Sequence, residues 1–286
     1  MTRDRTLLGV GGVLGAAALF STSGTAKALL EPDAWPPSVA AVRLAVGSLG
    51  MVAFVAWRGL GPDALTLLRR PLVWLMAVGV AGYQGFFFIG VQLTGVATGT
   101  LIALGSAPFL AGTLGWFVGE GAPGWVWAGA TAVGIAGLVL LTGSGDADLV
   151  GVFAALGAAA SYAVYTVFGA RLSRDGHDAS AVLTAAFVLG AVLLAPFLAR
   201  ADWLFSVSGV ALAAWLGLAA TTAAYLLFGL GLPVLQPGHI ATLTLLEPVG
   251  ATLWGVLLLG ERLSASGWFG CTLILGALLV VGVRER

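Results

Sequence analysis

Three observations predict an all-α integral membrane protein of ten transmembrane helices, arranged as two inverted five-helix repeats. First, 59% of the 286 residues are hydrophobic and 9% are charged, with a mean hydropathy of +1.02. Soluble domains carry about 25% charged residues, so this chain is expected to lie in a lipid bilayer. Second, the apolar residues form continuous runs without the period-two alternation of a membrane β-barrel. Third, the second half of the sequence repeats the first.

The repeat is clearest in two apolar runs that each contain a central proline and end in Gly-Glu. Residues 97–120 read ATGTLIALGSAPFLAGTLGWFVGE, and residues 237–261 read PGHIATLTLLEPVGATLWGVLLLGE. Upstream, the Leu-Gly-Ala-Ala-Ala of residues 14–18 recurs at residues 156–160, an offset of 142 residues. Two copies of one hydrophobic module are typical of a membrane carrier whose site lies between the copies.

Ten apolar segments are long enough to cross the ~30 Å hydrocarbon core as helices, at about 1.5 Å per residue. They are predicted at residues 6–30, 38–58, 71–92, 96–119, 124–142, 149–170, 179–199, 206–231, 238–259 and 264–283. The first five form one repeat, residues 1–143, and the last five form the second, residues 144–286. The first segment also has features of a cleaved signal peptide, but its alignment with an internal segment of the second repeat favours a retained helix.

The basic residues predict that both termini are cytoplasmic, because Lys and Arg gather on the inner side of membrane proteins. With the amino terminus inside, the outer side carries only Arg200 and Arg262. The inner side then carries Arg3, Arg5, Arg58, Arg69, Arg70, Arg171, Arg174, Arg284 and Arg286. An odd number of helices per repeat makes the second copy enter from the opposite side. Such inverted repeats suit alternating access.

Several function classes are disfavoured by the composition. The formal net charge is zero and no basic stripe is present, so nucleic acid is not an expected partner. Cys271 is the single cysteine, so neither a disulfide within the chain nor a cysteine metal cluster is predicted. The deep positions offer one carboxylate and no histidine pair, so we expect no enzyme, no metal and no cofactor. A channel remains an alternative that saturable counterflow would distinguish from a carrier.

A pattern around the second Gly-Glu run resembles a known family. Leu246-Glu247-Pro248-Val249 is followed by Leu259-Gly260-Glu261, and Arg43 lies early in the second predicted helix. Over essentially the whole chain this pattern resembles the EamA family of the drug/metabolite transporter superfamily, and the layout is similar to that of YddG-type amino-acid exporters. The resemblance implies a bacterial inner-membrane carrier that exports amino acids, aromatic or other apolar ones favoured, or related small metabolites. Phosphorylated sugars or nucleotide sugars are the alternative within the superfamily.

Glu247 is the most informative polar residue within the predicted helices. It lies about nine residues into the ninth segment, near the bilayer midplane, where a charged acid costs roughly 2.5–3.5 kcal/mol on insertion scales. Thr244 shares its helix face, and Pro248 is expected to leave a backbone carbonyl free. The acid binds a proton or a substrate amine, or it only hydrogen-bonds within the bundle. Ala107 holds the equivalent place in the first repeat, which favours a functional role.

The four tyrosines, Tyr83, Tyr162, Tyr165 and Tyr225, all lie inside predicted helices rather than at the interfaces where tyrosine usually gathers. Tyr83 and Tyr225 are separated by the repeat offset, so we expect them on opposite walls of one cavity. A tyrosine ring can stack on an apolar substrate while its hydroxyl binds a polar end. The alternative is that neighbouring helices satisfy the hydroxyls. For the set, a cavity lining is predicted.

Further polar groups extend the predicted wall, because hydroxyls and amides can coordinate a zwitterion at less cost than a full charge. The candidates are Gln84, Thr221, Thr222, Ser21 and Ser23. Each can instead hydrogen-bond to its own helix backbone.

Lys27 and Arg43 are the basic residues near the outer ends of their helices. Both are expected to reach the external interface, with binding of a substrate carboxylate or an outer gate as the alternative. Together with Glu247 they are the candidates for coupling or gating, and protons are the coupling ion that Glu247 suggests. The expected partners are a small-molecule substrate and the lipid bilayer, with the protein acting as a monomer or weak homodimer.

Overall fold

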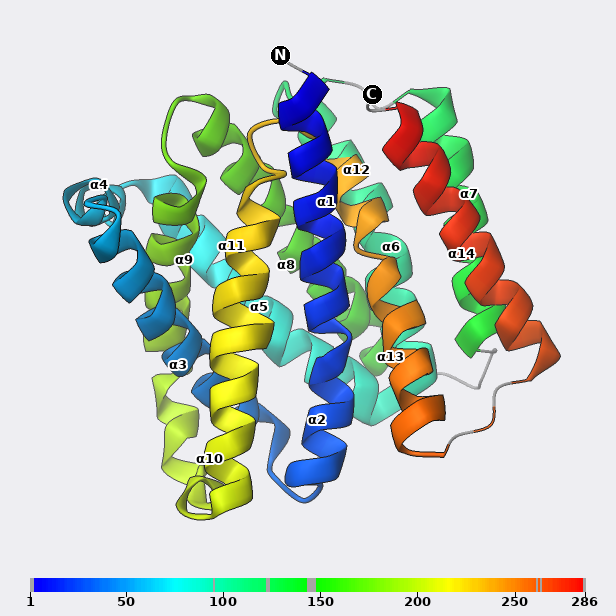
Figure 1. The fold of residues 1–286 in the computed structure, drawn as a ribbon, viewed down its shortest axis with the longest axis horizontal. Coiled ribbons are helices and arrows are strands. Elements are labelled where there is room, and N and C mark those ends of the chain that lie inside the picture. Colours follow the sequence, from blue (N-terminus) through cyan, green and yellow to red (C-terminus); the bar gives the residue numbers. More distant parts are fainter. Residues whose placement is uncertain are drawn as a thin grey trace.

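The helices form one bundle with both chain termini at the same end, here called the terminal side (Figure 1). The structure is a computed structural model that describes residues 3–94, 96–121, 124–142, 148–260, 262 and 264–284. Within these ranges every regular element is a helix. This confirms the predicted all-α class for the described part of the chain.

The helices of the first half begin and end close to the predicted bounds. They are α1 (Arg3–Phe20), α2 (Thr22–Leu30), α3 (Pro36–Trp57), α4 (Gly61–Leu67), α5 (Pro71–Thr94), α6 (Val96–Phe117) and α7 (Trp125–Thr142). Prolines at the first turns of α3 and α4 fit their starts, because proline presets the helical φ and its missing N–H is unpaired there in any case. Helix α4 is a short addition to the predicted set and meets the following helix at a bend of 87°.

The second half begins with α8 (Leu149–Arg174), whose Asp148 side chain caps its first turn by accepting from the Gly151 N–H at 3.0 Å. The remaining elements are α9 (Ala179–Leu194), the 3₁₀ turns η1 (Ala195–Arg200) and η2 (Asp202–Phe205), α10 (Val207–Ala214), the π-helix η3 (Trp215–Ala223), α11 (Ala224–Gly229), α12 (Pro237–Leu243), α13 (Leu246–Leu258) and α14 (Ala265–Arg284).

The ninth predicted segment corresponds to one apolar span, Pro237–Leu258, within which a short turn separates α12 from α13. Pro248 has no N–H to donate to the Thr244 carbonyl four residues earlier. The Glu247 N–H donates to that carbonyl instead, at 2.9 Å, so the carbonyl expected to be free is occupied. The Thr244 hydroxyl also bonds back to the Ala241 carbonyl at 2.8 Å. Local turn geometry therefore replaces the helix at mid-segment.

The first predicted segment is also interrupted, between α1 and α2 at Ser21. The Ser21 hydroxyl donates to the Ala18 carbonyl at 2.6 Å, a back-bond that bends helices. This interruption lies against α13, because the Trp254 indole of α13 donates to the Ser21 hydroxyl at 3.1 Å. A Cβ on Gly250 would lie 2.5 Å from that hydroxyl oxygen, so only glycine allows this approach.

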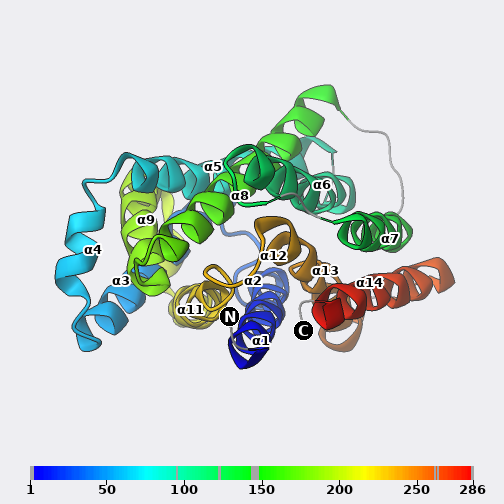
Figure 2. The same cartoon turned by 90° about the horizontal axis from the view of Figure 1, so that it is seen from above.

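Helix lengths and composition identify the parts that can cross a membrane. Six helices in the described part are long and apolar enough, and a seventh is added if the bent pair of α4 and α5 counts as one span. Three shorter apolar helices, Ile102–Phe117, Trp125–Leu140 and Ala265–Val281, accompany them. Figure 2 shows the last two side by side, within α7 and α14, at one edge of the bundle.

Candidate functional site

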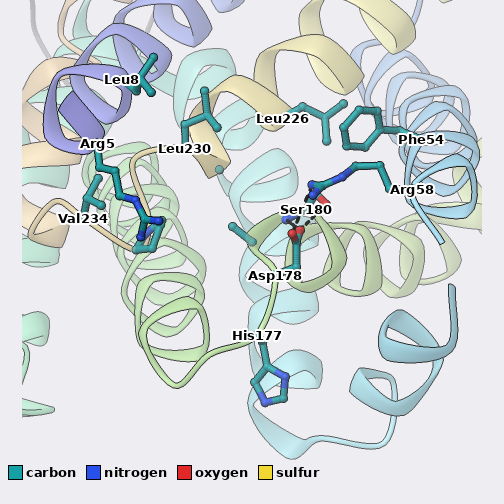
Figure 3. A pocket seen from close by; sticks show the side chains of 13 residues that line it. Arg5, Leu8, Phe54, Arg58, His177, Asp178, Ser180, Leu226, Leu230 and Val234 are labelled. Carbon is teal, nitrogen blue, oxygen red and sulfur yellow. Dashed lines mark hydrogen bonds and ion pairs between the residues drawn. The ribbon is translucent and has the colours of Figure 1, made fainter. Parts of the chain in front are cut away.

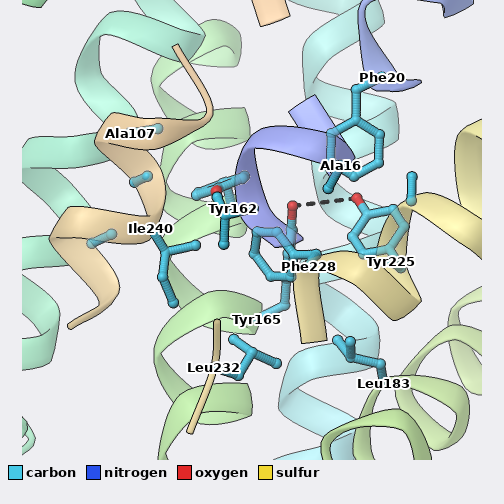
Figure 4. Close-up of a cluster of buried hydrophobic side chains, with 14 of the residues drawn as sticks. Ala16, Phe20, Ala107, Tyr162, Tyr165, Leu183, Tyr225, Phe228, Leu232 and Ile240 are labelled. Atoms are coloured by element: carbon cyan, nitrogen blue, oxygen red, sulfur yellow. Dashed lines mark hydrogen bonds between the residues drawn. The ribbon is translucent and has the colours of Figure 1, made fainter. Parts of the chain in front are cut away.

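Three of the predicted tyrosines lie in the buried core of the bundle (Figure 4). Tyr162, Tyr165 and Tyr225 are exposed by 5%, 2% and 7%. The hydroxyls of Tyr165 and Tyr225 lie 3.4 Å apart, and the Tyr225 ring packs against Phe187 at 4.3 Å between centroids and against Phe20 at 4.8 Å. Their ring faces are therefore covered by protein, and the hydroxyls form the polar part of the cluster.

The fourth tyrosine joins this cluster from α5. Tyr83 is partly buried, stacks on Phe87 at 5.7 Å between centroids, and tilts against Tyr162 at 6.3 Å. Tyr162 and Tyr165 meet edge-to-face at 5.1 Å. The four rings thus form a row across α5, α8 and α11, with Tyr83 and Tyr225 at its two ends. We call this row the tyrosine row.

Arg43 is directed into the bundle, so the expectation that it reaches the outer interface is wrong. Its Nε donates to the Thr221 hydroxyl at 3.3 Å, and one terminal guanidinium nitrogen donates to the Ala220 carbonyl at 3.2 Å. Both partners lie on the π-helix. Helix α3 lies against that π-helix because Gly47 and Gly217 carry no side chains: a Cβ on Gly47 would lie 2.4 Å from the Thr221 methyl carbon.

Glu247 lies in the first turn of α13, directly after the break, and is partly buried. Its carboxyl group interacts electrostatically with Arg43, and both groups interact with Tyr83 and Tyr225. Among the described residues the direct ion pairs are Arg58–Asp178 and Arg174–Glu120, so Arg43 and Glu247 are not joined directly. A cation on α3 and an acid on α13 therefore lie near the tyrosine row.

Of the three threonines predicted to line the site, one lies beside the tyrosine row and two lie on the π-helix. Thr244 joins the site, because its hydroxyl lies 3.2 Å from that of Tyr162. Thr221 holds Arg43, whereas Thr222 donates to the carbonyls of Gly47 at 2.9 Å and Gly217 at 3.0 Å. The hydroxyls of this pair thus join α3 to the π-helix.

Ser21 and Ser23 lie at the break between α1 and α2. Ser21 is 2% exposed, and the Ser23 hydroxyl is buried with no hydrogen-bond partner among the described residues. Gln84 is 6% exposed beside Tyr83. Lys27 lies apart, where its ammonium donates to the Pro32 carbonyl at 2.7 Å, in the loop that follows α2.

A connection that the sequence pattern did not predict lies on the terminal side. The Glu120 side chain, just beyond the end of α6, is 8% exposed and forms an ion pair with Arg174. Arg174 also donates to the Leu235 carbonyl, and Arg171 donates to the Val118 carbonyl at 3.2 Å. These contacts tie the ends of α6 and α8 to the turn before α12. The arginines three residues apart at the end of α8 were the available signal.

The site groups described above are hydrogen-bond donors and acceptors and two groups of opposite charge. No group of three His, Cys, Asp or Glu residues that could hold a metal ion occurs in the described ranges. One guanidinium, one carboxyl group and several hydroxyls can hold a ligand that carries both charges.

Comparisons with known proteins support a transport role. Residues 149–283 match the EamA-like transporter family. The chain is 39% identical over 279 residues to the uncharacterized transporter YwfM of Bacillus subtilis (strain 168), covering 96% of this chain and 93% of that protein. It is 29% identical over 259 residues to the threonine/homoserine exporter RhtA of Escherichia coli (strain K12), covering 87% and 82% of the two chains.

The fold is found among solved structures as well. A crystal structure with 24% sequence identity superimposes with a TM-score of 0.81 over 100% of both chains. The likeness to YwfM covers nearly the whole length of both proteins, and the apolar helices account for a multi-pass membrane location. The chain is therefore a transporter and not an enzyme, and it belongs to the EamA-like transporter family of the drug/metabolite transporter superfamily.

Proposed function

We propose that this protein is a bacterial inner-membrane carrier that exports amino acids by alternating access. The observation that carries the proposal is the placement of Arg43 and Glu247, two groups of opposite charge near the tyrosine row without a direct ion pair. A zwitterionic amino acid carries the two complementary charges on adjacent groups. Its carboxylate would bind the Arg43 guanidinium and its ammonium the Glu247 carboxylate.

The hydroxyls beside these charges suit a small polar substrate. Tyr162 and Tyr225 present hydroxyls while their ring faces are packed against protein, so stacking on a substrate ring is less available than hydrogen bonding. The similarity to an exporter of threonine and homoserine points the same way. We therefore place small hydroxylated amino acids ahead of the aromatic and apolar ones that the sequence alone favoured.

Alternating access requires two similar halves, and the helix packing supports the proposed inverted repeats of residues 1–143 and 144–286. The main contacts between helices of the first half and helices of the second half have counterparts formed by the equivalent helices of the opposite halves. Helix α1 packs on α11 as α8 packs on α5, and α3 packs on η3 as α9 packs on α5. Three further contacts, α3 with α9, α6 with α12 and α7 with α14, each join a helix to its own equivalent in the other half.

Equivalent glycines make equivalent close approaches. Gly9 and Gly151 are separated by the repeat offset of 142 residues. A Cβ on Gly9 would lie 2.5 Å from the Val234 side chain, just beyond α11, and a Cβ on Gly151 would lie 2.6 Å from the Thr94 side chain, at the end of α5. Because α1 starts on the terminal side and α8 starts at the other end, these matched contacts favour an inverted relation.

Several features remain part of the proposal. Both termini are placed in the cytoplasm by the arginine distribution, so the terminal side faces inward. We also propose that transport is coupled to protons through Glu247. The protein is proposed to act as a monomer or a weak homodimer. The alternative substrates, phosphorylated or nucleotide sugars, need more than one deep cation. In the described part of the chain, Arg43 is the basic side chain directed into the site, whereas Lys27 of α2 donates to the loop that follows that helix.

Reconstitution tests the proposed function. Proteoliposomes preloaded with unlabelled amino acid should take up labelled L-threonine or L-homoserine by saturable counterflow, with and without a pH gradient. L-Phenylalanine and L-leucine test the aromatic and apolar preference, and glucose 6-phosphate tests the alternative. Counterflow of glucose 6-phosphate without counterflow of any amino acid would reverse the assignment, and flux that does not saturate would indicate a channel.

A further inference from the structure

A pocket outside the candidate site opens at the terminal side, between α1, α3, α11 and the turn that joins α8 to α9 (Figure 3). Its volume is about 440 Å³, within the ~300–1,000 Å³ of typical ligand pockets. Arg5 and Arg58 reach it from opposite sides, and His177 and Asp178 line its base. Leu226 and Leu230 supply an apolar wall between the two arginines.

The pocket between Arg5 and Arg58 carries more positive than negative charge. Asp178 is already engaged, because it accepts from Arg58 at 3.2 Å and caps α9 by accepting from the Ser180 N–H at 2.8 Å. The Arg5 guanidinium has no ion-pair partner in the described part of the chain. Arg5 and the remaining N–H groups of Arg58 can therefore donate to the oxygens of an anion.

An apolar groove of about 580 Å³ continues from this pocket along α1 and α11. The two cavities share Leu8 and Leu230, so they adjoin. The groove runs from Asp4 to Gly12 on α1, a length of ~12 Å at the helical rise. Its floor is backbone at Gly11, where a Cβ would have nothing within 4 Å. A cationic pocket that leads into an apolar groove matches an anionic head followed by an acyl chain.

We propose that this pocket and groove bind one anionic phospholipid, with its phosphate between Arg5 and Arg58 and an acyl chain along Gly11. Basic pockets between transmembrane helices bind anionic lipid headgroups by this combination of charge and apolar contact. The lipid would bridge α1 and α11, which belong to different halves of the chain. The inference is independent of which substrate the carrier takes.

Native mass spectrometry of the detergent-purified full-length protein tests the proposal, with dioleoyl phosphatidylglycerol and dioleoyl phosphatidylcholine as probes. Arg5→Gln and Arg58→Gln should each weaken phosphatidylglycerol binding by about tenfold, since each removes a charge-assisted hydrogen bond. Arg58 and Asp178 are 44% and 29% exposed, so loss of this surface pair should leave the protein folded. The control Arg70→Gln removes an exposed charge from the same side, outside the pocket, and should change binding by less than about twofold.

A second pair of variants tests the groove without changing charge. Gly11→Leu fills the open space and should also weaken phosphatidylglycerol binding by about tenfold, whereas Gly276→Leu, on an equally open face of α14, should not. Equal binding of the two lipids, or equal effects of Arg5→Gln and Arg70→Gln, would overturn the proposal. Full displacement of the lipid by millimolar inorganic phosphate would instead identify a site for soluble anions.

Discussion

Arg43 owes its position to its hydrogen bonds with Ala220 and Thr221, which follow it in the chain by 177 and 178 positions. Its own neighbours in sequence suggest a residue near a helix end that can extend to the interface. The glycine contacts between α3 and the π-helix change that outcome, because they bring the Ala220 carbonyl and the Thr221 hydroxyl within reach. The hydrogen-bond partners of Arg43 are thus determined by how α3 packs on the π-helix.

Thr221 is predicted to act as a positioning residue for Arg43. Thr221→Val removes the hydroxyl that accepts from Arg43 Nε, so the KM for the amino acid that we propose as substrate should rise by about tenfold with little change in maximal rate. Thr222→Val is the matched control in the same π-helix, since its hydroxyl contacts backbone carbonyls only. Equal KM values for the two variants would contradict the role given to Thr221.

Glu31, in the loop after α2, is predicted to make stability depend on pH. Hydrogen bonds from the Ser206 and Ser208 hydroxyls lower the pKa of the Glu31 carboxyl below its usual range. A lowered folded-state pKa stabilises the protein above the unfolded pKa of about 4.3 and loses that effect as pH falls through the folded value. Glu31→Gln should therefore lower Tm at pH 7.

The Tm difference between wild type and Glu31→Gln should shrink below about pH 4. The check is a Tm series in detergent over this pH range. Asp202→Asn serves as the control, because the Asp202 carboxylate accepts no hydrogen bond within the described ranges. A Tm difference that stays constant with pH would refute the assignment.

At the scale of elements, the site is assembled from irregular helices. The α12–α13 break follows from Pro248, and the π-helix carries threonine hydroxyls that bond five residues back, at 2.7 Å for Thr221 and 3.0 Å for Thr222. Irregular helices at membrane depth are tolerated where protein surrounds them, and π segments recur at functional sites. Both irregular segments here contact the charges of the site.

Close packing of α3 on the π-helix is predicted to be essential to both stability and transport. A Cβ on Gly47 would lie 2.4 Å from the Thr221 methyl carbon and 3.2 Å from the Gly217 carbonyl oxygen. Gly47→Ala should therefore destabilise by about 1–3 kcal/mol, lower Tm by on the order of 5 °C and reduce transport, because Arg43 shifts with α3.

Gly276→Ala controls for the gain in helix propensity, since a Cβ there meets nothing within 4 Å. Thermal unfolding and counterflow are measured on the same preparations. If Gly47→Ala has the Tm and flux of Gly276→Ala, the close packing is not needed.

At the scale of the whole molecule, the apolar pattern of the sequence predicts most of the fold. Helix bounds agree to within a few residues because the lengths of apolar runs determine them. The π-helix and the Arg174–Glu120 pair could not be predicted in the same way. They depend on contacts between segments distant in sequence, such as Thr222 with Gly47, 175 residues apart. The candidate site was therefore predicted in its residue types but not in its geometry.

Topology is tested by single cysteines in a Cys271→Ser background. We expect membrane-impermeant maleimide to label Asp33→Cys and Asp202→Cys in intact cells, because the α2–α3 and α9–α10 connections that contain them lie on the side opposite the termini. Asp63→Cys and Asp175→Cys lie on the terminal side and should react only after the cells are opened. The reverse labelling pattern would place the termini outside.

The most direct test of the account is whether Arg43 and Glu247 recognise the two charges of the substrate. With the best amino acid of the counterflow panel, wild type should reject the amino-acid amide and the N-acetyl amino acid by at least about tenfold. Arg43→Gln should lose discrimination against the amide, and Glu247→Gln should lose discrimination against the N-acetyl form. If both variants keep the wild-type discrimination ratios, the two residues do not hold a zwitterion and the proposed site is wrong.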